Sequence, residues 1–201
     1  MKRKSTFRPA SGQKGFTLLE VMISMVIVTI GMISVLGALC YAMAANQVSQ
    51  QNMIARQLAS EAMESVYTAR NDSELSWAQI NNVSNGGIFV DGVLPVLCAG
   101  PDGILGTADD AGCTTISGAA CPNGGVQCLD EAGPDGKLGD ADDQIVSLAN
   151  YTRQIQITPL LDAFGNTIPT LRQVKITITY KALDPTQSKT YSIVEYISSY
   201  H

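Results

Sequence analysis

The chain begins with a short basic segment, which is followed by a long run of apolar positions. Residues 1–15 carry five Lys or Arg residues and no acid, whereas the 25 residues 21–45 carry no charge. At about 1.5 Å per residue, this run predicts a helix of roughly 37 Å, enough to cross a bilayer with some tilt. Because basic residues beside an apolar span stay in the cytoplasm, we predict that the chain beyond about Asn46 lies outside it.

The helix is predicted to continue beyond the apolar run to about Arg70. In residues 47–70 the pattern becomes amphipathic, with apolar residues at spacings of three and four. These apolar positions are Ile54, Ala55, Leu58, Ala59, Ala62, Met63 and Val66. A stripe of this kind packs on a sheet more often than it forms a binding site, so we assign it to the core.

The C-terminal part of the chain predicts β-strands. In the clearest case, Ile176 and Ile178 fall on one face of a strand while Thr177 and Thr179 fall on the other. The alternating segments are residues 151–158, 171–180 and 190–198, and turn signals at 162–166 and 184–185 separate them. Three such segments in a row predict an antiparallel meander over residues 151–198.

Residues 71–149 are rich in Gly, Asn, Asp, Ser and Pro. This composition predicts a short helix near Trp77, a strand or two within residues 88–97, and loops over residues 99–143. The predicted fold class is α+β, with a long N-terminal helix packed on a C-terminal antiparallel sheet.

One acidic residue interrupts the apolar pattern where the basic segment meets the helix. The junction reads Lys14-Gly15-Phe16-Thr17-Leu18-Leu19-Glu20-Val21. A carboxylate in an apolar helix costs about 2.5–3.5 kcal/mol on insertion scales, so Glu20 needs a reason to be there. A secretory signal peptide would have a shorter apolar region of about 7–15 residues. Hydropathy alone also fits an uncleaved anchor in which Glu20 is an interfacial residue near the helix end.

This junction resembles the processing site of type IV prepilins, whose pattern is Gly-Phe-Thr-Leu-hydrophobic-Glu. The resemblance implies that prepilin peptidase cuts after Gly15 and that the new amine of Phe16 is N-methylated. It also implies that Glu20 neutralises that amine on a neighbouring pilin. The implied parts of the pilin fold are a leader (1–15), a transmembrane and filament-core helix (16–46), its amphipathic continuation (47–70) and a globular head (71–201).

Within that family the chain most resembles minor pilins of the PilV type. This type is similar to proteins that prime pilus assembly or lie near the tip. The resemblance implies other pilins and minor pilins as partners, through the N-terminal helix. It also implies an inner-membrane precursor, and later a place in the pilus, the periplasm or the cell surface. A pseudopilin of a type II secretion system is a related alternative. An alternative from another class is a membrane-anchored calcium-dependent adhesin, which would retain residues 1–15 and would not need Glu20.

The charge balance and the motifs disfavour two other functions. The chain has 13 Lys and Arg against 18 Asp and Glu, and removing the leader leaves 8 against 18, a side-chain charge of −10. Such an acidic protein is poorly suited to nucleic-acid binding, which relies on basic residues. We expect no enzymatic activity, since the sequence has no phosphate loop and no credible nucleophile–base pair, and its single His is the terminal His201.

Residues 100–110 and 133–143 are two copies of one loop, identical at nine of eleven positions with an offset of 33. Calcium takes six to eight oxygen ligands. The carboxylates available are Asp102, Asp109 and Asp110 in the first loop and Asp135, Asp140, Asp142 and Asp143 in the second. Adjacent Asp pairs are unfavourable without a cation, so we predict calcium at one or both loops, which loosely resemble the calcium loop of major pseudopilins. The alternative is a pair of Asp/Gly turns in solvent.

Four cysteines lie in the region expected outside the cytoplasm, where oxidising conditions favour disulfides. They are Cys98, Cys113, Cys121 and Cys128. Of the three possible pairings we favour Cys98–Cys113 with Cys121–Cys128, because the first bond would hold the ends of the first Asp loop together. The other pairings stay open, and a zinc site is an alternative that lacks the usual short Cys spacings. Cys40 is predicted to be a packing residue in the apolar helix.

Overall fold

The structure, a computed structural model, describes residues 15–72, 74–181 and 187–200. The predicted leader up to residue 14, the predicted turn at 184–185 and His201 lie outside the described residues. The chain forms two compact units that divide between Asn46 and Gln47. Helix α1 (Leu18–Asn71) contributes residues to both units.

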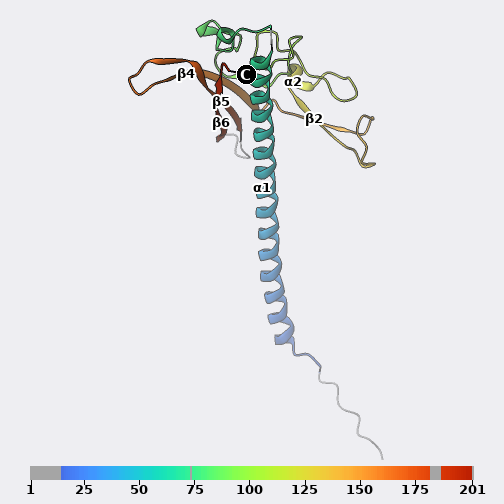
Figure 1. The fold of residues 1–201 in the computed structure, drawn as a ribbon. Helices are drawn as coiled ribbons and strands as arrows, with labels where there is room; N and C mark the ends of the chain where they lie inside the picture. The colour runs from blue at the N-terminus through green and yellow to red at the C-terminus, as the bar shows by residue number, and fades with distance from the viewer. Residues whose placement is uncertain (1–14, 73, 182–186, 201) are drawn as a thin grey trace, which may run out of the picture. The chain divides into compact units, whose positions relative to one another are not determined.

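In the first unit, α1 is a continuous helix (Figure 1). Large apolar residues are exposed along it from Leu18 to Met43. The helix begins after Thr17, whose Oγ1 accepts the backbone N–H of Glu20 at 3.3 Å and so satisfies one free amide of the first turn. Among the described residues, α1 is the one helix long and apolar enough to cross a membrane. A helix that is apolar all round needs lipid or protein around it, so this unit fits a membrane-anchored precursor.

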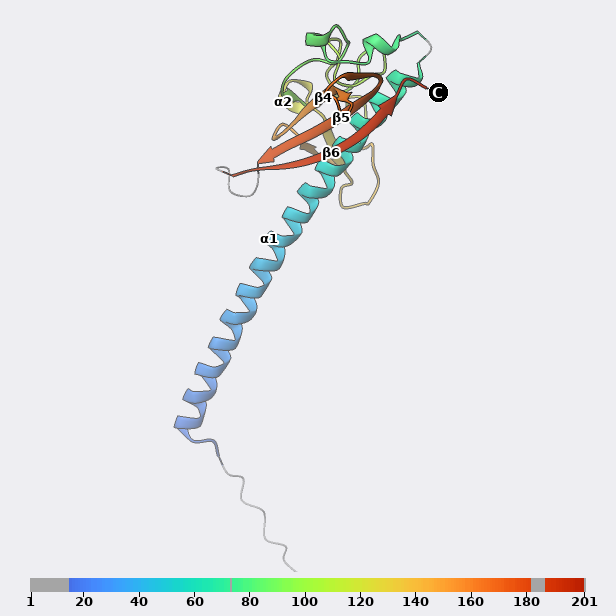
Figure 2. The ribbon, with the colours of Figure 1, turned by 60° about the vertical axis from the view of Figure 1, so that its left-hand side comes forward.

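In the second unit, the later part of α1 packs on a four-stranded antiparallel sheet (Figure 2). The strand order is β1 (Leu94–Pro95), β4 (Tyr151–Leu161), β5 (Thr167–Lys181) and β6 (Ser188–Ser198). Strands β4, β5 and β6 follow one another as antiparallel hairpins, as the alternation predicts. The predicted α+β fold, a long apolar N-terminal helix with a C-terminal antiparallel sheet, is confirmed.

The core lies between the amphipathic stripe of α1 and the inner face of the sheet. Ala55, Ala59 and Ala62 are fully buried, and their small side chains allow the helix to approach the strands closely. On the sheet, Ile176 is fully buried and pairs with Ile155 of β4 and Ile193 of β6. The predicted stripe is buried as expected, apart from Ile54, which lies at its margin and is only partly buried.

The region between α1 and the main sheet contains more regular structure than its composition predicts. It holds two 3₁₀ turns (Trp77–Gln79 and Val83–Asn85), the single turn α2 (Pro122–Gly125), and the hairpin of β2 (Cys128–Glu131) with β3 (Gln144–Ser147). The prediction of loops throughout residues 99–143 is therefore wrong at β2. That strand is four residues long and forms by pairing with β3, so it has too little alternation of its own to be recognised.

Candidate functional site

The N-terminal end of α1 contains the residues expected for processing and assembly. Gly15 and Phe16 precede the first helical residue, and Phe16 is 81% exposed. Glu20 lies in the first turn of the helix, where the helix dipole favours a negative charge. The arrangement leaves the Gly15–Phe16 bond in non-helical backbone, next to a carboxylate held in the first helical turn.

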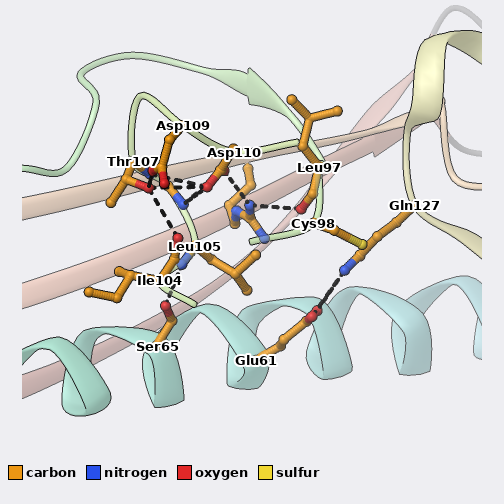
Figure 3. Close-up of polar contacts among 12 residues, drawn as sticks. Glu61, Ser65, Leu97, Cys98, Ile104, Leu105, Thr107, Asp109, Asp110 and Gln127 are labelled. Carbon is orange, nitrogen blue, oxygen red and sulfur yellow. Dashed lines mark hydrogen bonds and ion pairs between the residues drawn. The ribbon is translucent and has the colours of Figure 1, made fainter. Parts of the chain in front are cut away.

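The first Asp loop, residues 100–110, is docked against the head. Its Ile104 and Leu105 are almost fully buried, and the Leu105 backbone N–H donates to Ser65 Oγ of α1 at 2.6 Å (Figure 3). The disulfide between Cys98 and Cys113 joins the two sides of the loop. Residues 104–107 are therefore part of the folded core, whereas residues 101–103 and 108–109 are exposed.

The carboxylates of the first loop have partners within the protein. The Thr107 hydroxyl donates to Asp109 Oδ1 at 2.6 Å, and this hydrogen bond lowers the pKa of Asp109. Asp110 accepts the Gly106 backbone N–H at 2.9 Å and forms an ion pair with Arg153 of β4 at 3.4 Å. Both side chains of the ion pair are almost buried, with 2% of Arg153 and 8% of Asp110 exposed.

Burial sets the electrostatics of this ion pair. Loss of solvation raises the pKa of Asp110, while the Gly106 N–H and the Arg153 charge act in the opposite direction. Loss of solvation also lowers the pKa of Arg153, and Asp110 opposes that change. Each charge therefore depends on the other, because an isolated buried charge is strongly unfavourable.

Arg153 is a residue that the sequence analysis missed, although the sequence contains a signal for it. The inward-facing positions of β4 are Tyr151, Arg153, Ile155 and Ile157, all buried. A charged residue at an inward position of a half-buried strand predicts a buried partner of opposite charge. The sequence alone does not say which of the many Asp residues supplies that partner.

The second Asp loop, residues 133–143, repeats the backbone of the first but is exposed. The Lys137 N–H donates to Asp135 Oδ1 at 2.9 Å, just as the Ile104 N–H donates to Asp102 Oδ1 at 2.8 Å. The matching glycines, Gly106 and Gly139, have φ values of 84° and 97°, a region that non-glycine residues rarely adopt. The loop connects β2 to β3, and most of it is exposed to solvent.

Three carboxylates converge in the second loop. One ligand oxygen each of Asp135, Asp140 and Asp142 lies within 4.8 Å of the others. The pKa of Asp140 is raised, chiefly by its hydrogen bond with Asp142 and also by burial and the charge of Asp143. One oxygen of Asp143, Oδ1, is buried without a hydrogen-bond partner among the described residues. This set of oxygen donors fits a hard metal cation, and the converging group contains residues of the second loop only.

Both disulfides of the favoured pairing are present. Cys98 bonds to Cys113 with their Cα atoms 5.2 Å apart, and Cys121 bonds to Cys128 with their Cα atoms 5.8 Å apart. The zinc alternative fails because all four thiols are used in these bonds. Cys40 is free and exposed on the apolar part of α1.

Comparison with known proteins identifies the junction but not the head. Residues 10–36 match the family model described as the prokaryotic N-terminal methylation motif. Together with the fold, this match supports a type IV pilin-like protein. The motif implies processing by prepilin peptidase and assembly with other pilins, and it suggests a structural role. No curated protein and no solved structure matches the chain. The role of the head therefore has to be argued from its own geometry.

Proposed function

We propose that the protein is a minor pilin of a type IV pilus, with a structural and non-catalytic role. The observation that carries the proposal is Glu20, a lone carboxylate in the first turn of an otherwise apolar helix segment, five positions from Gly15. Cleavage after Gly15 releases the positive amine of Phe16. When subunits pack together, Glu20 neutralises this amine on a neighbouring pilin, which offsets the cost of a carboxylate in apolar surroundings.

The sequence resemblance favours the PilV type, whose members prime assembly or lie near the pilus tip. In this proposal the precursor stays in the inner membrane with its N-terminus in the cytoplasm, and the head lies outside. A pseudopilin of a type II secretion system has the same junction and is the second candidate. Mass spectrometry of the N-terminus distinguishes them: N-methylated Phe16 in sheared surface filaments supports a pilin, and its restriction to membranes supports a pseudopilin or priming role. An intact Met1 or Lys2 terminus in both fractions contradicts processing and favours a fixed adhesin anchor.

Glu20→Ala and Glu20→Gln test the docking argument. We expect both variants to insert in the membrane at wild-type levels but to be lost from the filament fraction, because neither side chain carries a charge to neutralise the Phe16 amine. Ser24→Ala, one helical turn further on, is the matched control and is expected to assemble normally. Normal incorporation of Glu20→Gln would contradict a charge-based role.

We further propose calcium as the cation of the second Asp loop. The support is its set of oxygen donors: three converging carboxylates, and the Oδ1 of Asp143, which has no hydrogen-bond partner in the described part of the chain. In the first loop the corresponding groups are held by Arg153, Thr107 and backbone amides, so the proposal is restricted to residues 133–143. The ion would hold the exposed loop in one conformation and would have no catalytic role.

A further inference from the structure

A groove follows one flank of α1 in the head. It consists of three adjoining cavities of about 480, 400 and 250 Å³. The first two cavities share Ile54 and Leu129, and the second and third share Glu61 and Cys98. The wall formed by α1 extends over residues 47–68, which is roughly 30 Å of helix. The opposite wall comes from the β2–β3 hairpin, the disulfides and the first Asp loop.

The charged side chains that line this groove are all acidic. They are Glu61, Glu64 and Glu131, and no Lys or Arg lines any of the three cavities. Within the described residues, the hydrogen-bond donor to Glu61 is neutral, the side-chain amide of Gln127 at 3.0 Å (Figure 3). A fourth acceptor, Gln51 Oε1, is buried without a hydrogen-bond partner among the described residues. A buried acceptor without a partner is unfavourable, so this acceptor and the three carboxylates favour a partner that supplies hydrogen-bond donors.

The groove also exposes apolar surface. Met53 and Val146, which line its largest cavity, are 66% and 38% exposed. The combination of apolar walls and acidic groups fits a partner surface that carries both hydrocarbon and positive charge. Long basic side chains have this character, since their aliphatic stems pack on apolar surface while their charged ends remain polar.

The other flank of α1 carries such groups. Arg56 is exposed on the side of α1 that faces β6, and its guanidinium lies 5.6 Å from the centre of the Tyr191 ring. Lys189 of β6 pairs in register with Tyr180, whose hydroxyl donates to Asn52 one helical turn before Arg56. Neither Arg56 nor Lys189 forms a salt bridge within the part of the chain that the structure describes. Strand β6 is also the last strand of the sheet, so among the described residues no further strand pairs with its outer edge.

We propose that the groove of one copy of this protein receives the Arg56–Lys189 flank of a second copy. The inference rests on the proposed role as a polymerising subunit and names the surfaces through which the heads would associate. The two surfaces have opposite charge and lie on opposite flanks of the same helix. A contact between two different surfaces does not close at two subunits, so it allows the heads of more than two copies to associate.

Charge reversal in the full-length protein, purified in detergent, tests the contact by sedimentation over a concentration series. Glu131→Lys changes the groove and Arg56→Glu changes the flank. We expect each variant alone to lower the association constant about tenfold or more, because like charges then face each other across the contact. We expect an equimolar mixture of the two variants to regain association, since each then offers the other a complementary surface.

Glu74→Lys and Lys175→Glu are the matched controls, because both residues are exposed and lie outside the groove and the flank. They change the net charge by the same amounts and are expected to associate like the wild type. Equal effects in the controls, a wild type that remains monomeric, or no recovery in the mixture would each overturn the inference. The sedimentation assay does not depend on processing at Gly15. A negative result would therefore contradict the contact without contradicting the proposed function, and an unprocessed N-terminus would contradict the proposed function without deciding the contact.

Discussion

The two Asp loops are nearly the same sequence in two different surroundings. They are identical at nine of eleven positions and make the same local turns, including the N–H bonds of Gly103 to Gly100 and of Gly136 to Gly133, both 3.0 Å. Residues 104–107 of the first loop are buried against α1 and β4, whereas residues 137–140 of the second loop are exposed. The shared sequence determines the turns, while the surroundings determine how the carboxylates are satisfied.

The two positions at which the copies differ reflect their buried and exposed surroundings. Ile104 is buried, and its counterpart Lys137 is exposed and forms a salt bridge with Asp135. Thr107 supplies a hydroxyl that donates to Asp109, and its counterpart Asp140 instead adds a third carboxylate to the cluster. The docked copy therefore has an internal cation, Arg153, and the exposed copy has a set of acceptors suited to an external one.

The largest effect is expected from Arg153→Ala. The substitution leaves the Asp110 side chain, which is 8% exposed, without its partner, and removing one member of a buried ion pair costs about 3–5 kcal/mol. Denaturant unfolding of the purified protein measures this loss. Lys137→Ala removes the exposed ion pair of the second loop and is expected to change the free energy of unfolding little. Arg153→Met combined with Asp110→Asn should recover part of the loss, and an unchanged stability of Arg153→Ala would show that the ion pair does not hold the loop.

Calcium is expected to stabilise the wild type through the second loop alone. At a free concentration one hundred times its dissociation constant, an ion that binds only the folded protein adds about 2.7 kcal/mol. Thermal unfolding with calcium and with a chelator measures the shift in Tm. We expect Asp142→Asn to remove the shift and the matched Asp109→Asn of the first loop to retain it. The opposite result would move the calcium site to residues 100–110.

Thr107 and Asp140 occupy the second of the two positions at which the loops differ. Exchanging these residues should transfer part of each loop's stability and calcium response to the other loop. Asp140→Thr removes one carboxylate, so we expect a higher Tm without calcium and a weaker response to it. Thr107→Asp removes the hydroxyl that donates to Asp109 and adds a negative charge next to it, so we expect a lower Tm. A calcium response that is unchanged in Asp140→Thr would exclude this carboxylate as a ligand.

The smallest expected effect is the pH dependence, which has opposite signs in the two loops. The pKa of Asp109 is lowered, so its contribution to stability is present above the ordinary value of 3.8 and is lost as the pH falls through its lowered folded pKa. The pKa of Asp140 is raised, so without calcium the folded state binds its proton more tightly, and stability rises as the pH falls towards 3.8. Unfolding measured between pH 3 and 6 tests both trends. Thr107→Ala should remove the trend due to Asp109, and Asp140→Asn should remove the trend due to Asp140. Stability profiles identical to that of the wild type would contradict this assignment.

The sequence by itself determined the features that depend on local periodicity and on one short motif. Strict alternation over residues 171–180 and the stripe in α1 gave the sheet, the helix and their contacting faces, because side-chain direction follows from the position along a strand or helix. The junction around Gly15 and Glu20 indicated the class of protein, and residues 10–36 match that motif.

Only the tertiary structure decided the features that depend on which distant segments meet. Strand β2 exists because β3 pairs with it, and the Asp110 charge is matched by a residue 43 positions away in the sequence, Arg153. The groove beside α1 likewise combines the helix with loops from the middle of the chain. Two copies of one loop could diverge in this way because hydrogen bonds within a turn are local, whereas solvation and charge compensation depend on everything packed around it.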